Sequence, residues 1–213
     1  MALYSKAVQH VRNWFRQKNN LLTLLLAVLG AITVLFYTAM NNNDQLVDVS
    51  SLRPLMKVIA DAESNGNYNA YFGNAANTSI DFTTMSVEDV QGWQAEFIKD
   101  GSPSSAVGRY QIINTTLDGL ISELDIDETQ AFDAALQDTL SVALIHRRGA
   151  KQYVNGELSD KQFAANLAKE WAALPKVTGN NPSESYYASD GLNQSSVSIQ
   201  TILKAVLTVK PIE

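Results

Sequence analysis

The chain has 213 residues, of which 46% are apolar and 18% are charged, and its formal net charge is −6. This composition supports a folded core and excludes a disordered polyelectrolyte, and 11 glycines and 5 prolines exclude collagen-like and Pro/Gly-rich chains. The absence of cysteine excludes disulfides, thiol catalysis, iron–sulfur clusters and Cys-ligated zinc, and the presence of only two histidines argues against a multi-histidine metal site.

The charges are unevenly distributed along the chain. The first 20 residues contain Lys6, Arg12, Arg16 and Lys18 and no acidic residue. Every one of the 22 acidic residues lies beyond residue 40, so the remaining chain has 12 basic residues against 22 acids, a net charge of −10. Because phosphate binding requires clustered Lys and Arg, we predict no nucleic-acid partner.

Residues 21–40, LLTLLLAVLGAITVLFYTAM, carry no charge. As a helix this segment is about 30 Å long, which matches the hydrocarbon core of a bilayer. We therefore predict a transmembrane helix over 21–40, a basic amphipathic segment over 1–20 and a linker over 41–51. Two alternatives are a buried core helix and a cleaved signal peptide, whose apolar region is usually shorter, about 7–15 residues.

The basic residues precede this span, and the positive-inside rule then places the N-terminus inside and the domain 52–213 outside. The expected localisation is a single-pass membrane protein, in a virion membrane or in the host inner membrane with the domain facing the periplasm. A lipid bilayer is thus a predicted partner, and other virion membrane proteins are possible partners.

The domain 52–213 is predicted to be mainly α, with a small β or loop lobe near residues 68–85. Apolar spacing and capping residues predict its helices. In chain order we expect a helix that Ser51 caps and that ends near Gly66, a polar loop over 65–85, a helix that Ser86 starts, a loop over 100–108, a helix over 117–124, a helix from Thr129 to Gly149, a helix from Ser159 to Pro175, a polar loop over 176–194 and a last helix over 199–206.

Glu63 is the first candidate catalytic residue, because it lies at the predicted C-terminal end of an apolar helix. The helix dipole and partial burial both disfavour its ionised form. A carboxyl group that stays protonated near neutral pH is what general-acid catalysis on a glycosidic oxygen requires. Taken alone, the position also fits an ordinary solvated charge at a helix end.

Two further segments have residue types that suit sugar binding. Gly108-Arg109-Tyr110-Gln111 combines a permissive glycine with a flat ring and an amide, although Arg109 also fits a structural ion pair. Trp171-Ala172-Ala173-Leu174-Pro175 follows an apolar helix pattern, and Trp171 at this spacing is typical of a core residue.

In this order and spacing, Ala62-Glu63-Ser64, Gly108–Gln111 and Trp171–Pro175 resemble segments of the lambda-phage-type endolysins. These are lysozyme-fold lytic transglycosylases that cleave peptidoglycan, and the resemblance, which extends to phage virion muramidases, covers residues 53–207. It departs from the family in the added N-terminal span and in the strong acidity of the domain.

The resemblance implies a lysozyme-like domain with Glu63 as the single catalytic carboxylate. Glu63 would protonate the β-1,4 bond between N-acetylmuramic acid and N-acetylglucosamine, and would then take the proton of the muramic C6 hydroxyl, which gives a 1,6-anhydro product. The implied substrate-binding residues are Ser64, Gly108, Tyr110, Gln111 and Trp171. Peptidoglycan is the implied partner, and no metal or cofactor is implied.

Three alternatives remain open at this point. A hydrolytic muramidase needs a second carboxylate, for which Asp81 is the best candidate and Asp100 a weaker one. A non-catalytic glycan-binding or virion scaffold module is a different class, because a lysozyme fold does not guarantee cleavage. The expected setting is a phage, and the open choice there is between local opening of the wall during genome entry and lysis of the host.

Overall fold

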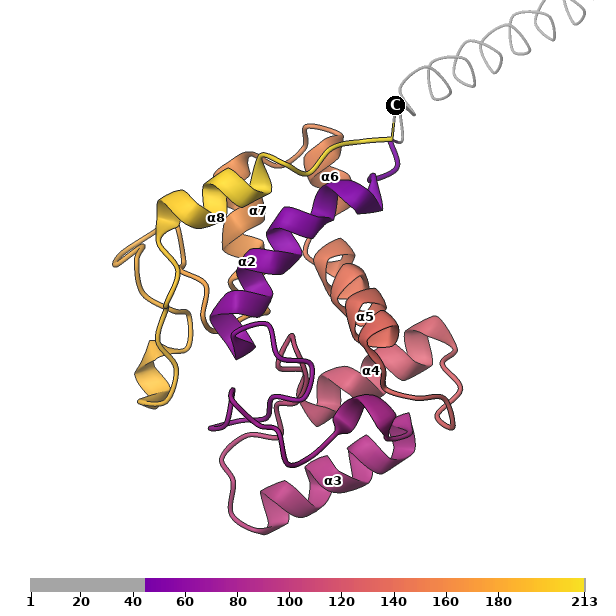
Figure 1. Cartoon of the computed structure of the whole chain (residues 1–213). Coiled ribbons are helices and arrows are strands. Elements are labelled where there is room, and N and C mark those ends of the chain that lie inside the picture. Colours follow the sequence, from indigo (N-terminus) through magenta and orange to yellow (C-terminus); the bar gives the residue numbers. More distant parts are fainter. Residues whose placement is uncertain (1–44, 213) are drawn as a thin grey trace, which may run out of the picture. The chain divides into compact units, whose positions relative to one another are not determined.

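The computed structural model describes residues 45–212, and within that range the backbone is mainly helical, as predicted (Figure 1). Three short 3₁₀ helices accompany the α-helices: η1 (Val49–Leu52), η2 (Phe82–Thr84) and η3 (Ala188–Asp190). The seven α-helices of this range are α2 (Arg53–Ser64), α3 (Val87–Lys99), α4 (Asn114–Leu124), α5 (Ala134–Arg147), α6 (Ala150–Val154), α7 (Asp160–Leu167) and α8 (Ile199–Val206).

Serine side chains start three of these helices. Ser86, Ser159 and Ser198 each accept a hydrogen bond from the backbone N–H three residues further on, at the start of α3, α7 and α8. At α7 the side chain of Gln162 also bonds back to the cap residue, which completes a capping box. These bonds satisfy N–H groups that have no partner inside a helix, and they confirm the starts predicted at Ser86 and Ser159.

The predicted starts of α2 and α5 are wrong, because Ser51 and Thr129, the expected cap residues, each belong to a turn that precedes the helix. Ser51 lies within η1, whose cap is Asp48, and α2 begins at Arg53. The N–H and hydroxyl groups of Thr129 donate to Asp127, and the helix begins only after Asp133. The side chain of Asp48 caps η1 and that of Asp133 caps α5, whereas α2 continues from η1 without a side-chain cap.

The predicted helix from Ser159 to Pro175 is too long, since α7 ends at Leu167. Beyond it, the backbone turns through Lys169, Glu170, Trp171 and Leu174, whose N–H groups bond to carbonyls three or four residues back. This run of turns brings Trp171 into the core and places the residues around it near the end of α2.

The predicted β element near 68–85 is limited to isolated bridges. Tyr71 pairs with Asn74 and with Val107. Asparagine side chains, in place of a neighbouring strand, form hydrogen bonds with the backbone of this loop. Buried Asn77 donates to the carbonyl groups of Asn69 (2.5 Å) and Ile80 (2.7 Å). The loop therefore satisfies its backbone groups locally, which removes the need for strand pairing.

The core forms around α2, which packs against α8 (Figure 1). The buried apolar residues of α2, Leu55, Met56, Ile59 and Ala60, recur every three or four positions, so that they share one face of the helix. α8 lies beside α2 and also contacts α7. The helix that carries Glu63 is thus held along its whole apolar face.

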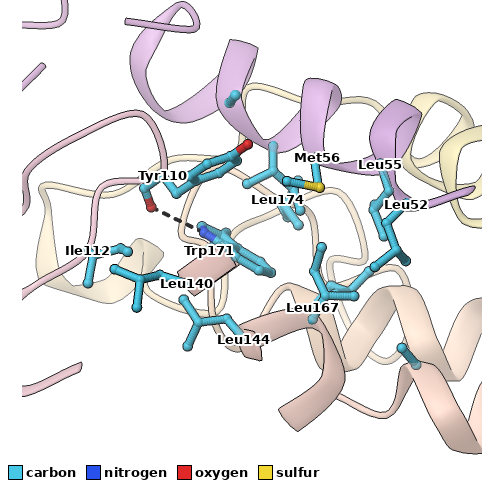
Figure 2. Close-up of a cluster of buried hydrophobic side chains, with 14 of the residues drawn as sticks. Leu52, Leu55, Met56, Tyr110, Ile112, Leu140, Leu144, Leu167, Trp171 and Leu174 are labelled. Carbon is cyan, nitrogen blue, oxygen red and sulfur yellow. Dashed lines mark hydrogen bonds between the residues drawn. The ribbon is translucent and has the colours of Figure 1, made fainter. Parts of the chain in front are cut away.

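Trp171 lies inside this core, with only 3% of its surface exposed. Figure 2 shows its ring surrounded by leucines of α5 and α7 and by Met56 and Leu174. Its indole N–H donates to the carbonyl oxygen of Tyr110 at 3.2 Å, so the one polar atom of the ring is satisfied. Trp171 therefore connects the turns after α7 to the segment that contains Tyr110.

The two ends of the described range pair with each other. Val47 forms an antiparallel bridge with Pro211, and the N–H of Ile212 donates to the carbonyl of Leu46 at 2.8 Å. Val47 is buried. Residues 45–48 therefore belong to the packed unit formed by the described residues, although we expected a linker over 41–51.

The predicted localisation as a single-pass membrane protein requires correction. Among residues 45–212, no helix is both long and apolar enough to cross a bilayer. The longest of them, α5, has 14 residues and is about 21 Å long, against about 30 Å of hydrocarbon. The predicted span over 21–40 and the basic segment over 1–20 lie outside the described residues.

Replacement of Ile202 by Ala tests the packing of α8. Ile202 is fully buried, and the truncation leaves a cavity, so we expect the free energy of unfolding to fall by about 2–5 kcal/mol. Leu207→Ala, at a position that is 60% exposed, is the control and is expected to change it by less than about 0.5 kcal/mol. Urea unfolding of both variants measures this, and equal losses would contradict the packing described.

Candidate active site

A pocket of about 390 Å³ opens beside the C-terminal end of α2. Four of the residues singled out from the sequence line it: Glu63, Tyr110, Gln111 and Trp171. The other lining residues come from the loop after α2, from the loop before α4, from α4, from the end of α5, from the turns after α7 and from the loop around η3: Phe72, Pro103, Ser104, Ala106, Ile112, Ile113, Thr116, Leu144, Arg148, Lys169, Glu170, Ala172, Tyr187, Asp190, Leu192 and Asn193.

Glu63 is the last residue but one of α2, and its side chain lines the pocket. Burial of its carboxyl group raises its pKa to about 7, and a hydrogen bond from the N–H of Ala173, at 3.0 Å to Oε1, opposes this rise. The raised pKa agrees with the expectation from the sequence, and its main cause is desolvation. At neutral pH the protonated and ionised forms are both well populated.

The turn over 108–111 carries two residues with left-handed backbone conformations. Gly108 has φ of 77° and Gln111 has φ of 49°. The amide of the Gln111 side chain donates to the carbonyl of Gly108 at 2.9 Å, while Val107 and Ile112 close the turn by pairing with each other. The conformation presents Tyr110 and Gln111 to the pocket, and Gly108 itself does not line it.

A buried glutamine of α5 holds this turn in place. Gln137 accepts a hydrogen bond from the N–H of Arg109 at 2.8 Å, and its amide donates to the carbonyls of Tyr68 and Phe132. The turn is also tied to α2, because the hydroxyl of buried Ser64 donates to the carbonyl of Arg109 at 2.7 Å. Ser64 thus supports the turn and does not line the pocket.

Arg109 points into a network of tyrosines. Its guanidinium lies over the ring of Tyr68, 4.7 Å from the centroid, and Nη1 donates to the hydroxyl of the same residue. The hydroxyls of Tyr68 and Tyr110 both donate to one oxygen of Asp138, at 3.0 and 2.7 Å. Burial and this carboxylate raise the pKa of Tyr110, which keeps its hydroxyl protonated as a donor. The ring of Tyr110 is therefore fixed in orientation.

The candidate second carboxylates lie elsewhere. Asp81 is exposed and accepts a hydrogen bond from Thr83, and exposed Asp100 follows the last turn of α3; neither lines the pocket. The structure instead brings Glu170 and Asp190 to the pocket wall, and neither was predicted as a second carboxylate.

Both of these carboxylates have partners. Glu170 pairs with Arg148, and Asp190 accepts hydrogen bonds from residues 192 and 193. Within residues 45–212, no three His, Asp or Glu side chains gather in an arrangement that would hold a metal ion.

Comparison with known protein families decides the family of this chain. The model of the Endolysin family matches residues 55–195, more than half of the chain, and this range includes Glu63, the turn over 108–111 and Trp171. The chain belongs to the endolysin family. Comparisons with curated proteins and with solved structures find no match.

Membership in the endolysin family supports a phage cell-wall-degrading enzyme whose substrate is peptidoglycan. The pocket suits such a substrate, because polar side chains and flat rings line it together, as they do in sites that bind sugars. The three segments that resembled lambda-type endolysins in the sequence all contribute to the pocket or to its supports.

Gly108→Ala tests the geometry of the turn in this endolysin. A Cβ atom there would lie 2.4 Å from the side-chain oxygen of Gln137, on a backbone with positive φ. We expect a loss of about 2–4 kcal/mol in the free energy of unfolding. The matched control is Gly73→Ala, which also has positive φ but nothing within 4 Å, and should lose about 1 kcal/mol. Equal losses in thermal and urea unfolding would argue against a tight contact with Gln137.

The pKa of Glu63 predicts a pH dependence of stability. Because burial raises the pKa from 4.5 to about 7, the folded state favours the protonated form, and this contribution is lost as the pH rises between these values. Glu63→Gln cannot ionise, so its stability relative to wild type should increase by up to about 3 kcal/mol between pH 4 and pH 8.5. Urea unfolding of both proteins across this range measures the difference, and a constant difference would show that the carboxyl group is not desolvated.

Proposed function

We propose that this endolysin is a peptidoglycan lytic transglycosylase that uses Glu63 first as a general acid and then as a general base. The observation that carries the proposal is the desolvated carboxyl group of Glu63 in the wall of the pocket, with a pKa of about 7. A group with that pKa gives up a proton and takes one back with little cost at neutral pH.

The proposed reaction has two steps. Protonated Glu63 donates its proton to the oxygen of the β-1,4 bond between N-acetylmuramic acid and N-acetylglucosamine, and the bond from C1 of the muramic residue to that oxygen breaks. The carboxylate of Glu63 then accepts the proton of the muramic C6 hydroxyl while that oxygen bonds to C1. The products are a free 4-hydroxyl and a 1,6-anhydro end, no water is consumed, and Glu63 ends protonated.

Neighbouring groups support both forms of Glu63. The N–H of Ala173 bonds to Oε1 and stabilises the carboxylate formed after the first step. Tyr110 and Gln111, presented by the rigid turn, are proposed to orient the sugar rings against the pocket wall. Trp171 supports this wall from the core, where it bonds to the carbonyl of Tyr110 (Figure 2).

The placement of the other carboxylates favours transglycosylation over hydrolysis. A hydrolytic mechanism needs a second carboxylate about 5–9.5 Å from the acid, as nucleophile or as base for water. Asp81 does not line the pocket, Glu170 is engaged by Arg148, and Asp190 is engaged by neighbouring backbone N–H groups. A single acid–base residue is consistent with this arrangement.

For the biological setting we propose local opening of the wall of a bacterial host by a phage, with host lysis as the alternative use of the same activity. Both uses need the same bond to be cleaved. Detection of the protein in purified phage particles favours a role in genome entry, and its restriction to late-infected cells favours a role in lysis.

Glu63→Gln should abolish cleavage. Gln keeps the shape of the side chain and can still accept the hydrogen bond from Ala173, but it cannot exchange a proton, so we expect the release of soluble fragments from purified sacculi to fall at least about a hundred-fold. Asp81→Asn is the control and should keep activity near that of wild type.

The mass of the products tests the class of reaction. An anhydro end is lighter by one water than a hydrolysed end, so mass spectrometry of the wild-type digest should find the lighter fragments. Hydrolysed ends together with an inactive Glu63→Gln variant would make the enzyme a muramidase. Wild-type cleavage by Glu63→Gln would refute the assignment of the catalytic residue.

A further inference from the structure

Two basic side chains line the same pocket as Glu63. Arg148 follows the last residue of α5, and Lys169 lies in the turns after α7. They stand out because the domain is acidic, with 12 basic residues against 22 acids beyond residue 20. Two basic side chains in the pocket wall of an acidic domain raise the question of which anionic group of the substrate they could bind.

Arg148 is held in a fixed position. Its Nε donates to Oε2 of Glu170 at 2.7 Å, and Nη2 pairs with the same oxygen at 2.5 Å and reaches the carbonyl of Lys169 at 3.3 Å. The side chain of Glu170 is 12% exposed and that of Arg148 is 33% exposed. Nη1 makes no hydrogen bond within the described part of the chain, so its two N–H groups remain available as donors.

Lys169 is exposed beside this pair. Its Nζ donates to the side chain of Asn166 at 3.2 Å and lies 6.0 Å from the centre of the Tyr186 ring. The carbonyl of Lys169 also accepts the hydroxyl of Tyr187, another residue of the pocket wall. The ammonium group is therefore held near the pocket by neutral neighbours, and no carboxylate within hydrogen-bond range neutralises it in the described range.

The pocket also contains three carboxyl groups, those of Glu63, Glu170 and Asp190, and only Glu170 pairs with one of the two cations. Glu63 is largely protonated below its pKa of about 7. Asp190 stays ionised, because hydrogen bonds from the side chain of Asn193 and from the backbone N–H groups of Leu192 and Asn193 lower its pKa, and it forms no ion pair with Lys169 or Arg148 within the described range. Glu170 balances one of the two cations. The ammonium group of Lys169 and the Nη1 edge of Arg148 therefore have no carboxylate partner within the described range and are available to a bound anion.

We propose that Arg148 and Lys169 form a carboxylate-binding subsite, through which the pocket recognises the anionic groups of peptidoglycan. This inference rests on the proposed function, since it assigns the charged part of the same substrate. The carboxylate belongs either to the lactyl ether of muramic acid, where the peptide has been removed, or to the peptide stem. An uncharged chitin strand offers neither, so the subsite would separate peptidoglycan from chitin.

Binding measurements on the full chain with Glu63→Gln test this subsite without cleavage. The ligands are chitohexaose, peptide-free glycan strands with free lactyl carboxylates, and strands with intact peptide stems. Adding Lys169→Gln should weaken binding of an anionic strand by about two- to five-fold, which is the size of a solvent-exposed ion pair, and should leave chitohexaose unaffected. The loss should shrink at high salt.

The control replaces a lysine of the same segment outside the pocket. Lys161→Gln in α7 changes the charge equally, is exposed and does not line the pocket, so it should leave all three affinities unchanged. Lys169→Arg should restore binding of the anionic strands. A loss confined to stem-bearing strands identifies the stem as the source of the carboxylate, a loss confined to peptide-free strands identifies the lactyl group, and a loss with both supports the subsite for either source.

The role of Arg148 is tested with its partner removed at the same time. Arg148→Gln with Glu170→Gln leaves no unpaired buried charge, and thermal unfolding checks that the fold is kept. We expect this double variant to weaken anionic strands selectively as well. Equal weakening of chitohexaose, or unchanged binding of every ligand by both variants, overturns the subsite, whereas cleavage by Glu63→Gln would overturn the catalytic assignment alone.

Discussion

The desolvation of one carboxyl group organises this structure. Glu63 lies one residue before the end of α2, whose buried face packs against α8 and the core, and this packing places the carboxyl group in the pocket wall. Burial favours the neutral acid, and the hydrogen bond from Ala173 favours the carboxylate. The balance between the two sets a pKa near neutrality, which is the property that an acid–base residue needs.

The wall facing Glu63 is rigid for reasons that lie outside the pocket. Gln137 holds the turn over 108–111 from α5, Ser64 holds it from α2, and Trp171 holds the carbonyl of Tyr110 from the core. Each of these bonds is buried or partly buried, so losing one partner leaves another polar group unsatisfied. The supports of the site are thereby part of the stability of the fold, and changes in them affect both.

The sequence predicted the helical class and the starts of α3 and α7, because capping and apolar spacing are local signals. The grouping of Glu63 with Tyr110, Gln111 and Trp171 came from the resemblance to lambda-type endolysins and not from those local signals. The predictions from sequence failed where contacts between residues far apart in the chain determine the structure. Gln137 carries no motif, and its role appears only when α5 packs against the turn. The helix expected to run to Pro175 ends at Leu167, since burying Trp171 outweighs continuing the helix. Asp81 was favoured by chain order alone, while folding brought Glu170 and Asp190 to the pocket.

The pairing of Leu46 with Ile212 has a mechanical consequence. The polypeptide enters and leaves the described unit at one spot, and α2 starts only a few residues after that spot. A pulling force on the chain before residue 45 would act first on the hydrogen bond between Leu46 and Ile212, and only afterwards on the helix that carries Glu63. A partner fused at either end of the described unit would therefore emerge from the same corner of it.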